Sequence, residues 1–150
     1  MQATTAVTPK LVAEQLLGLW VHLTRDTGGE LFRLLEGLQL GLTQLKTLDH
    51  LGACESEPTV KELAERLGLS LPGTSRNVDG LLRRGYVERR EDEHDRRMKR
   101  LRITDAGRDV VTRVNVARLQ GLEAWAATLT DPQREQLSAA LAPITEGLPR

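Results

Sequence analysis

The sequence is poor in cysteine, in aromatic residues and in long apolar runs. Its one cysteine, Cys54, cannot form an intrachain disulfide, so we expect a reduced, cytoplasmic protein. No run of about 18 apolar residues occurs, so no transmembrane helix is predicted, and the start MQATTAVTPK lacks the features of a signal peptide. Aromatic residues make up 3% of the chain, too few for a base-stacking surface that binds single-stranded nucleic acid.

The residue groupings of common enzymes and metal sites are also missing. The chain has no glycine-rich phosphate loop, no Gly-x-Ser-x-Gly turn and no second thiol, so neither enzymatic activity nor a cofactor is predicted. The three histidines, at 22, 50 and 94, share no ligand spacing, which argues against a metal site. The run 92–95 could hold a metal weakly, but a solvated loop is the favoured interpretation.

Charge is distributed unevenly, although the chain as a whole is neutral. Residues 59–104 carry 12 Lys and Arg against 8 Asp and Glu, while the rest of the chain carries 9 against 13. A basic segment between acidic flanks predicts a module that binds a polyanion. Because aromatic residues are few, double-stranded nucleic acid is favoured over single strands.

Apolar periodicity predicts helices toward both ends of the chain. Helices over 10–25 and 31–38 are separated by the glycine-containing segment 25–30, after a disordered tail over residues 1–9. A third helix, capped by Thr43, ends at a polar turn over 55–58. A long helix follows over about 105–129, and Asp131 and Pro132 start the last one. The apolar stripes of the terminal helices need a partner, for which a second copy of the chain is the commonest solution.

The basic segment predicts a helix-turn-helix. Val60, Leu63, Ala64 and Leu67 form one face of a short helix that Gly68 can end in a left-handed conformation. Ser70 can cap the second helix, which has Pro72 in its first turn and ends at Gly85. Two short helices joined by about four residues are typical of this motif.

The stretch EDEHDRRMKRLRITDAG (91–107) predicts the tip and return strand of a β-hairpin. Leu101 and Ile103 alternate with Arg100 and Arg102, which is the period of a half-buried strand. The segment YVERR before the tip supplies the first strand. The predicted fold class is therefore mainly α with a small β-hairpin (α+β).

This order of elements resembles the MarR family of winged helix-turn-helix transcriptional regulators. The hairpin pattern Asp-x-Arg followed by Leu/Ile-Thr-x-x-Gly is present as Asp95, Arg97, Ile103, Thr104 and Gly107. LAERLGLS (63–70) and SRNVDGLLRRGYVER (75–89) are similar to the family's second helix, recognition helix and first strand. The resemblance implies a winged helix-turn-helix domain over 42–104, with dimerisation helices over 10–41 and 105–150. Asn77 and Gly80 depart from the pattern, since a larger apolar and a basic residue are expected there.

The resemblance also implies a role for the charged hairpin tip, the wing. Arg97 would enter the minor groove of DNA, which suits a guanidinium because a narrow groove is strongly negative. Asp95 would hold Arg97 extended by a charge-assisted hydrogen bond, and Arg96, Lys99 and Arg100 would meet phosphates. An exposed loop of weak ion pairs is the alternative.

On the recognition helix, Arg76 is the best candidate for reading bases, because arginine can bond guanine O6 and N7 in the major groove. Thr74, Ser75 and Asn77 are short polar neighbours suited to phosphate or base contact, with plain helix surface as the alternative. Ser70 is interpreted as a cap rather than a contact.

These observations favour a homodimeric transcriptional repressor that binds a pseudo-palindromic site in double-stranded DNA. The resemblance implies a small-molecule effector with a pocket between the terminal helices and the winged domain. Trp20, His22 and His50 are candidate pocket residues, although a core aromatic and surface histidines are the favoured alternative. Cys54 does not match the family's peroxide-sensing cysteine and is interpreted as a partly buried thiol. The competing hypothesis is a winged-helix module that binds protein without specific DNA binding.

Overall fold

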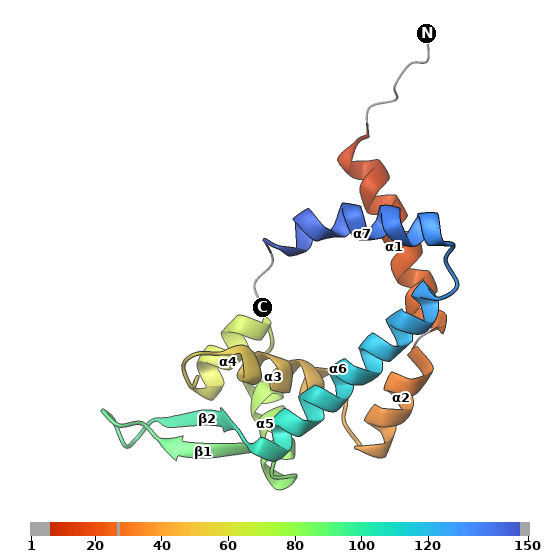
Figure 1. The fold of residues 1–150 in the computed structure, drawn as a ribbon. Coiled ribbons are helices and arrows are strands. Elements are labelled where there is room, and N and C mark those ends of the chain that lie inside the picture. The colour runs from red at the N-terminus through yellow and green to blue at the C-terminus, as the bar shows by residue number, and fades with distance from the viewer. Residues whose placement is uncertain (1–6, 27, 148–150) are drawn as a thin grey trace. The chain divides into compact units, whose positions relative to one another are not determined.

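The computed structural model describes residues 7–26 and 28–147, in which seven helices and one antiparallel hairpin are found (Figure 1). This confirms the predicted class, mainly α with a small hairpin. The chain divides into two compact units, residues 33–116 and residues 1–32 together with 117–150. The elements are α1 (Pro9–Asp26), α2 (Gly28–Gly37), α3 (Leu42–Ala53), α4 (Val60–Leu67), α5 (Leu71–Arg83), β1 (Val87–Glu91), β2 (Lys99–Ile103), α6 (Asp105–Ala126) and α7 (Asp131–Thr145).

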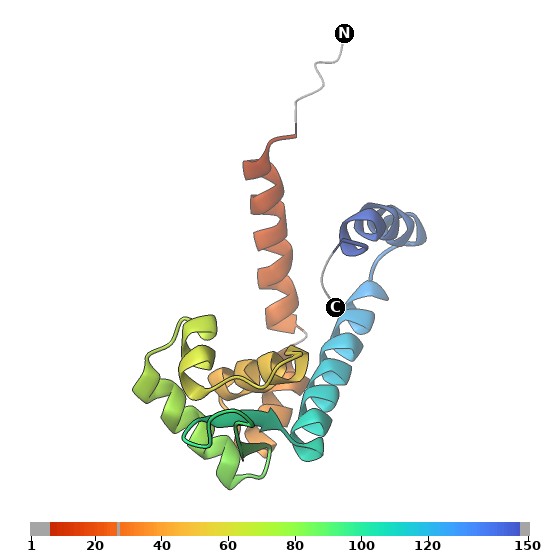
Figure 2. The same cartoon turned by 90° about the vertical axis from the view of Figure 1, so that its left-hand side faces the viewer.

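The unit of residues 33–116 has a core between α3, α4, α5 and the hairpin (Figures 1 and 2). Each of these elements contributes apolar side chains at the spacing that its secondary structure requires, so one continuous core forms. The buried side chains from these elements include Leu45, Leu48, Leu51, Leu63, Val78, Leu81, Val87, Leu101 and Ile103.

The helix-turn-helix has the predicted end signals. Gly68 ends α4 in the left-handed region, with φ 65°, where glycine is not strained. Ser70 caps α5, its Oγ accepting a hydrogen bond from the Gly73 N–H at 3.2 Å. Thr59 and Glu62 form a reciprocal capping box at the start of α4. These local signals fix where both helices begin and end.

The predicted hairpin is present, and its antiparallel strands place Val87 opposite Ile103 and Glu91 opposite Lys99. Leu101 and Ile103 point into the core, which confirms the alternation along β2. The N–H of Leu101 also donates to the Pro58 carbonyl at 2.8 Å, so β2 is bound to the segment that precedes α4. The hairpin is therefore attached to the helix-turn-helix along its inner edge.

Two predicted helix boundaries were wrong, and a third was confirmed. The pair Gly28 and Gly29 belongs to α2 rather than to a break, because α1 ends at Asp26 and α2 begins at Gly28. Thr43 lies inside α3, whose N-cap is Gly41, and the Gln44 side chain accepts from the Gly41 N–H at 3.2 Å. The predicted start of α7 at Asp131 is confirmed, and the preceding residue, Thr130, is its N-cap, whose side chain accepts from the Gln133 N–H.

The second unit contains α1, the start of α2, the end of α6, and α7. α7 buries no residue, and no described helix is long and apolar enough to cross a membrane. Of the predicted tail, residues 1–6 lie outside the described part and Pro9 already belongs to α1. The division into dimerisation helices (10–41 and 105–150) and a DNA-binding domain (42–104) stays a prediction. Large apolar side chains are exposed on α1, α6 and α7, namely Leu11, Val12, Leu16, Leu17, Trp20, Leu119, Leu122, Leu141 and Ile144.

Candidate DNA interface

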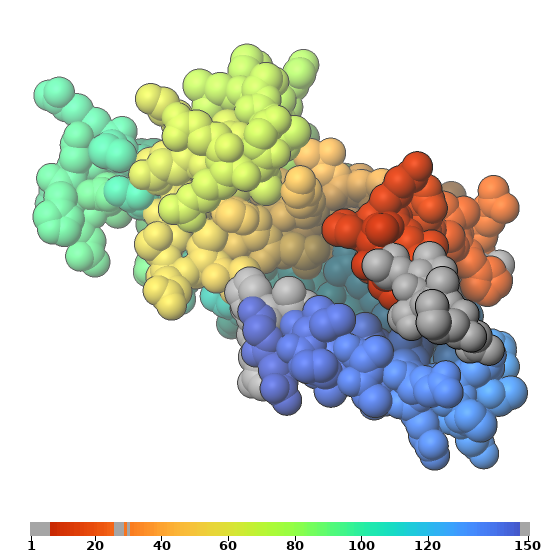
Figure 3. Space-filling view, turned by 90° about the horizontal axis from the view of Figure 1, so that it is seen from above, coloured from red at the N-terminus to blue at the C-terminus, as the bar shows by residue number. Residues whose placement is uncertain are grey.

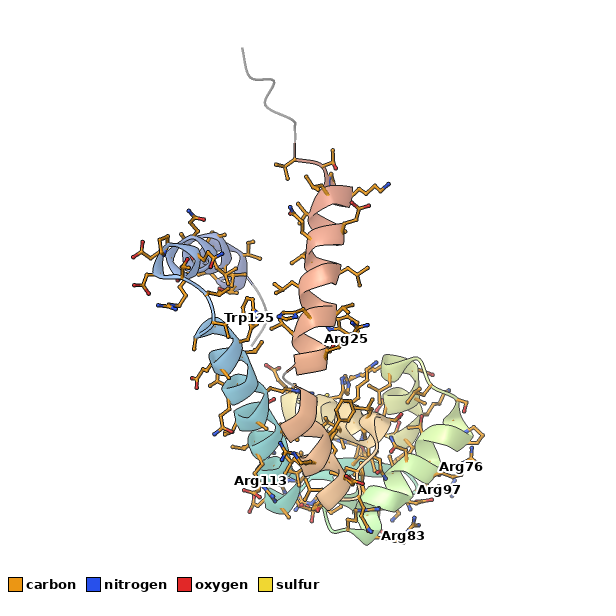
Figure 4. All side chains as sticks on the ribbon, turned by 90° about the vertical axis from the view of Figure 1, so that its right-hand side faces the viewer. Arg25, Arg76, Arg83, Arg97, Arg113 and Trp125 are labelled. Atoms are coloured by element: carbon orange, nitrogen blue, oxygen red, sulfur yellow. The ribbon has the colours of Figure 1, made fainter. Side chains whose placement is uncertain are left out.

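The outer face of α5 carries arginines. Arg76 and Arg83 are seven residues apart, a spacing that places them on one side of a helix. Both are exposed, and Figure 4 shows them extending away from the ribbon of α5. Neither guanidinium makes an ion pair within the described part of the chain. The sequence analysis did not include Arg83 among the candidate DNA contacts, although its spacing from Arg76 could have identified it.

An ion pair neutralises the acid that lies between these two arginines. Asp79 is three residues after Arg76 and four before Arg83, so it shares their face. Its Oδ1 lies 2.8 Å from Arg89 Nη2 on β1. The sequence did not predict this ion pair. Because Asp79 is neutralised by Arg89, the outer face of α5 keeps the positive charge of Arg76 and Arg83.

The inner side of α5 packs closely on α3 through the two residues that depart from the family pattern. The side-chain amide of Asn77 donates to Thr47 Oγ1 at 2.6 Å. At Gly80 an added Cβ would lie only 2.6 Å from Gln44 Nε2. Asn77 and Gly80 therefore fit α5 against α3. The Asn77 NH2 group is engaged by α3, and a DNA contact of Asn77 stays a prediction.

A correction concerns Thr74. This side chain is 0% exposed, and its hydroxyl donates to the Ser70 carbonyl at 3.0 Å. It faces the core with Val78 and Leu81, so it does not reach DNA without unfolding the helix. Ser75 is half-buried and remains a predicted contact.

The hairpin lies at one margin of the unit of residues 33–116, the winged unit, in Figure 3. Arg96 and Arg97, at its tip, are exposed to solvent. Neither guanidinium forms an ion pair with a residue that the structure describes. Asp95 was expected to hold the Arg97 guanidinium, but its Oδ1 accepts the backbone N–H of Arg97 instead, at 2.9 Å. Asp95 therefore shapes the turn that carries Arg97 and leaves the side chain of Arg97 unbound.

The two other basic residues assigned to phosphates, Lys99 and Arg100, are paired within the protein. Lys99 Nζ lies 2.8 Å from Glu91 Oε1, across the hairpin. Arg100 Nε lies 2.6 Å from Asp92 Oδ2, and Arg100 Nη1 lies 3.1 Å from Glu62 Oε2. Arg100 is thus engaged on two sides, which corrects its assignment as a free phosphate ligand.

These contacts shift the protonation equilibria around Arg100. The Arg100 guanidinium, followed by the backbone N–H groups of His94 and Asp95, lowers the pKa of Asp92 to about 2. The hydrogen bond from the Thr59 backbone, with the charge of Arg100, lowers the pKa of Glu62 despite an opposing effect of desolvation. The hydrogen bond to Asp92 raises the pKa of Arg100. All three groups are charged at neutral pH.

The residues considered as metal ligands do not come together in the described part of the chain. Within the described residues, no three of His, Cys, Asp and Glu could hold a metal ion together. Cys54 is half-buried, as predicted, and its Sγ accepts a hydrogen bond from Arg66 Nη1 at 3.4 Å.

The predicted effector pocket draws on residues of both compact units. Trp20, which is 62% exposed, and His22 lie on α1, whereas His50 lies on α3 in the winged unit. His50 is half-buried, and its buried Nε2 has no hydrogen-bond partner among the described residues. The pocket therefore stays a prediction.

Known proteins resemble both the sequence and the fold of this chain. A sequence model of the MarR family matches residues 38–98. The transcriptional repressor MprA of Escherichia coli K12 is 33% identical over 76 residues, which cover 51% of this chain and 43% of MprA. The chain thus matches less than half the length of this relative.

Solved structures extend the likeness over nearly the whole fold. RV1404 from Mycobacterium tuberculosis has a TM-score of 0.77 at 24% identity, covering 99% of this chain and 100% of that chain. MepR of S. aureus in complex with DNA has a TM-score of 0.70 at 22% identity, covering 91% and 99%. MepR bound to ethidium bromide has a TM-score of 0.66 at 21% identity, covering 87% and 94%. The matched segment holds the helix-turn-helix, β1 and the hairpin tip, so this part of the chain is similar to the MarR family, and the chain as a whole shares the fold of these solved structures.

Proposed function

We propose that this chain is a homodimeric transcriptional repressor that binds a specific sequence of double-stranded DNA. In each protomer, α5 would lie in the major groove and the hairpin tip in the adjacent minor groove. The observation that carries the proposal is the division among the arginines of α5 and the hairpin. Arg76, Arg83, Arg96 and Arg97 are exposed and make no ion pair with a described residue, whereas Arg89, Arg90, Arg100 and Arg102 have carboxylate partners.

Unpaired arginines at these two places match the chemistry of the DNA grooves. A guanidinium on α5 can form two hydrogen bonds with guanine in the major groove. A guanidinium at the hairpin tip suits the negative potential of a narrow minor groove. The MepR–DNA complex and the repressor MprA support this reading, since the first shows DNA on the same fold and the second is a repressor with a similar central sequence.

The dimer is supported by the exposed apolar side chains of α1, α6 and α7. Leu16, Leu17 and Trp20 on α1, for example, are each more than half exposed. Several such residues on neighbouring turns are typical of a protein interface. A two-fold dimer would place the two α5 helices on half-sites about one helical turn of DNA apart, so the operator would be pseudo-palindromic.

Release by a small molecule is the regulatory part of the proposal. The complex of MepR with ethidium bromide supports it, because this fold can bind a planar organic cation. Trp20, His22 and His50 remain the candidate contacts. If effector and operator favour different arrangements of the protein, saturating operator must weaken effector binding by the same factor that the effector weakens DNA binding.

The proposal is tested by selecting bound sites from a pool of random duplexes and measuring affinity for the selected site at several salt concentrations. We expect a two-fold symmetric consensus, an affinity that falls steeply with salt because counterions are released from phosphates, and a dimer by sedimentation. If no duplex is enriched, the chain is better described as a winged-helix module that binds protein. A monomer at micromolar concentration would remove the dimer.

A further inference from the structure

We propose that Asp92 and Arg100 are positioning residues, which hold the hairpin tip in the orientation that lets Arg97 enter the minor groove. This inference rests on the proposed function, since it concerns how the same surface meets DNA. It assigns Asp92, an acid in a DNA-binding loop, a favourable effect on DNA binding.

Arg100 connects the hairpin to the start of α4. Its Nη1 donates to Glu62 Oε2 at 3.1 Å and to the Glu57 carbonyl at 3.2 Å. Glu62 is itself fixed, because Oε2 accepts the Thr59 N–H at 2.7 Å as part of the capping box of α4. Since Arg100 is on β2, the orientation of the hairpin is tied to the first helix of the helix-turn-helix.

Asp92 connects Arg100 to the tip. Its Oδ2 accepts from Arg100 Nε at 2.6 Å, and its Oδ1 accepts the backbone N–H groups of His94 at 2.8 Å and Asp95 at 3.1 Å. Asp95 in turn accepts the N–H of Arg97 at 2.9 Å. The contacts therefore run without a gap from the α4 cap, through Arg100 and Asp92, to the backbone of Arg97.

Burial separates Asp92 and Arg100 from the other charges of the tip. The side chain of Asp92 is 12% exposed and that of Arg100 is 28% exposed. The adjacent Glu93 is exposed and has no hydrogen bond or ion pair to a described residue. A loop that is ordered before binding loses less conformational entropy on binding, so the Asp92 contacts should increase affinity. Glu93 should only repel phosphates.

Neutralising Asp92 and neutralising Glu93 should change the affinity for DNA in opposite directions. Asp92→Asn and Glu93→Gln remove the same charge from neighbouring positions, and each is compared with wild type on the selected duplex. Simple electrostatics predicts that both variants bind more tightly. The proposal predicts that Glu93→Gln binds equally or more tightly, whereas Asp92→Asn binds about tenfold more weakly. If Asp92→Asn binds as Glu93→Gln does, Asp92 has no positioning role.

A double-variant cycle tests whether the effect passes through Arg97. In the Arg97→Ala background, Asp92→Asn and Arg100→Lys should weaken binding much less than they do in wild type, because the Arg97 guanidinium that they position is absent. Arg100→Lys keeps the positive charge, but a lysine cannot donate in the three directions in which the guanidinium donates to Asp92, Glu62 and the Glu57 carbonyl. Full additivity with Arg97→Ala would overturn the proposal and indicate a direct phosphate contact or a general loss of structure.

A measurement without DNA separates this inference from the proposed function. Hydrogen exchange of the backbone amides of residues 94–97 should be faster in Asp92→Asn and Arg100→Lys than in wild type, and unchanged in Glu93→Gln. Equal exchange in all four proteins would refute the positioning role, whatever the DNA result. If the exchange differs as expected but wild type selects no duplex, the proposed function fails while the tip is still shown to be held by these residues.

Discussion

The Asn77 side chain joins α5 to α3 by a hydrogen bond of 2.6 Å to Thr47 Oγ1. Thr47 is fully buried, and its hydroxyl donates a hydrogen bond to the Thr43 carbonyl at 2.9 Å. Next to this contact, Gly80 leaves room for the Gln44 side chain. The placement of the proposed recognition helix thus depends on polar contacts as well as on apolar packing.

Asn77→Ala should lower the free energy of unfolding by about 1 kcal/mol, because it removes a hydrogen bond to a buried hydroxyl. Thr47→Val should be destabilising as well, since it leaves the Asn77 amide without its acceptor. In the double variant the two losses should not add, which chemical denaturation of all four proteins would show. Strict additivity would mean that the two side chains do not interact.

Gly107→Ala should be strongly destabilising, by about 1–3 kcal/mol, because there is no space for a methyl group. An added Cβ would overlap the Tyr86 carbonyl oxygen, which is backbone and cannot move aside cheaply. Gly52→Ala is the matched control, since its Cβ would meet only Ile103 Cδ1 at 3.8 Å. This control should be neutral or gain up to about 1 kcal/mol from helix propensity. Equal thermal stability of the two variants would contradict the close contact between Gly107 and the Tyr86 carbonyl.

The sequence predicted the elements well where the deciding signals are local. Gly68, Ser70 and the alternation of Leu101 and Ile103 act on adjacent residues or on one face, and these features were all found. The cap of α3 was misplaced because Gly41 has no side chain, and the signal there comes from Gln44, three residues later. A glycine cap of this kind is hard to distinguish from a loop.

Acid should destabilise the winged unit through Asp92. Its pKa is about 2 in the folded protein, below the ordinary value of 3.8, so its contribution to stability is present above about pH 4 and is lost as the pH falls toward 2. Glu62 and Glu91 have lowered pKa values and act in the same direction. Between pH 4 and 2, Asp92→Asn should therefore lose less stability than wild type in denaturation curves. Parallel pH profiles would show that Asp92 is not bound to Arg100 in solution.

The candidate site was predictable in its residue types but not in its pairings. The sequence assigned a DNA contact to each of Arg76, Arg97 and Arg100, and it did not show which of them is paired within the protein. Arg100 differs because Glu62, 38 positions earlier, comes within 3.1 Å of it in the fold. Thr74 similarly has the polarity of a contact residue, and only the packing of α5 shows that its side chain faces inward.

The most direct test of the proposed interface compares three single-arginine variants on the selected duplex and on its single-base variants. Arg76→Ala should lose roughly 1–3 kcal/mol per half-site and relax the preference at one base pair. Arg97→Ala should weaken binding while keeping the major-groove preferences, and its loss should be greatest for sites with a narrow minor groove at the hairpin. Arg113 on α6 is the control, because it is exposed, makes no ion pair within the described part of the chain, and lies apart from Arg76 in Figure 4. Arg113→Ala should bind as wild type does. If all three variants lose the same affinity with no change in base preference, only overall charge matters and the proposed interface is wrong.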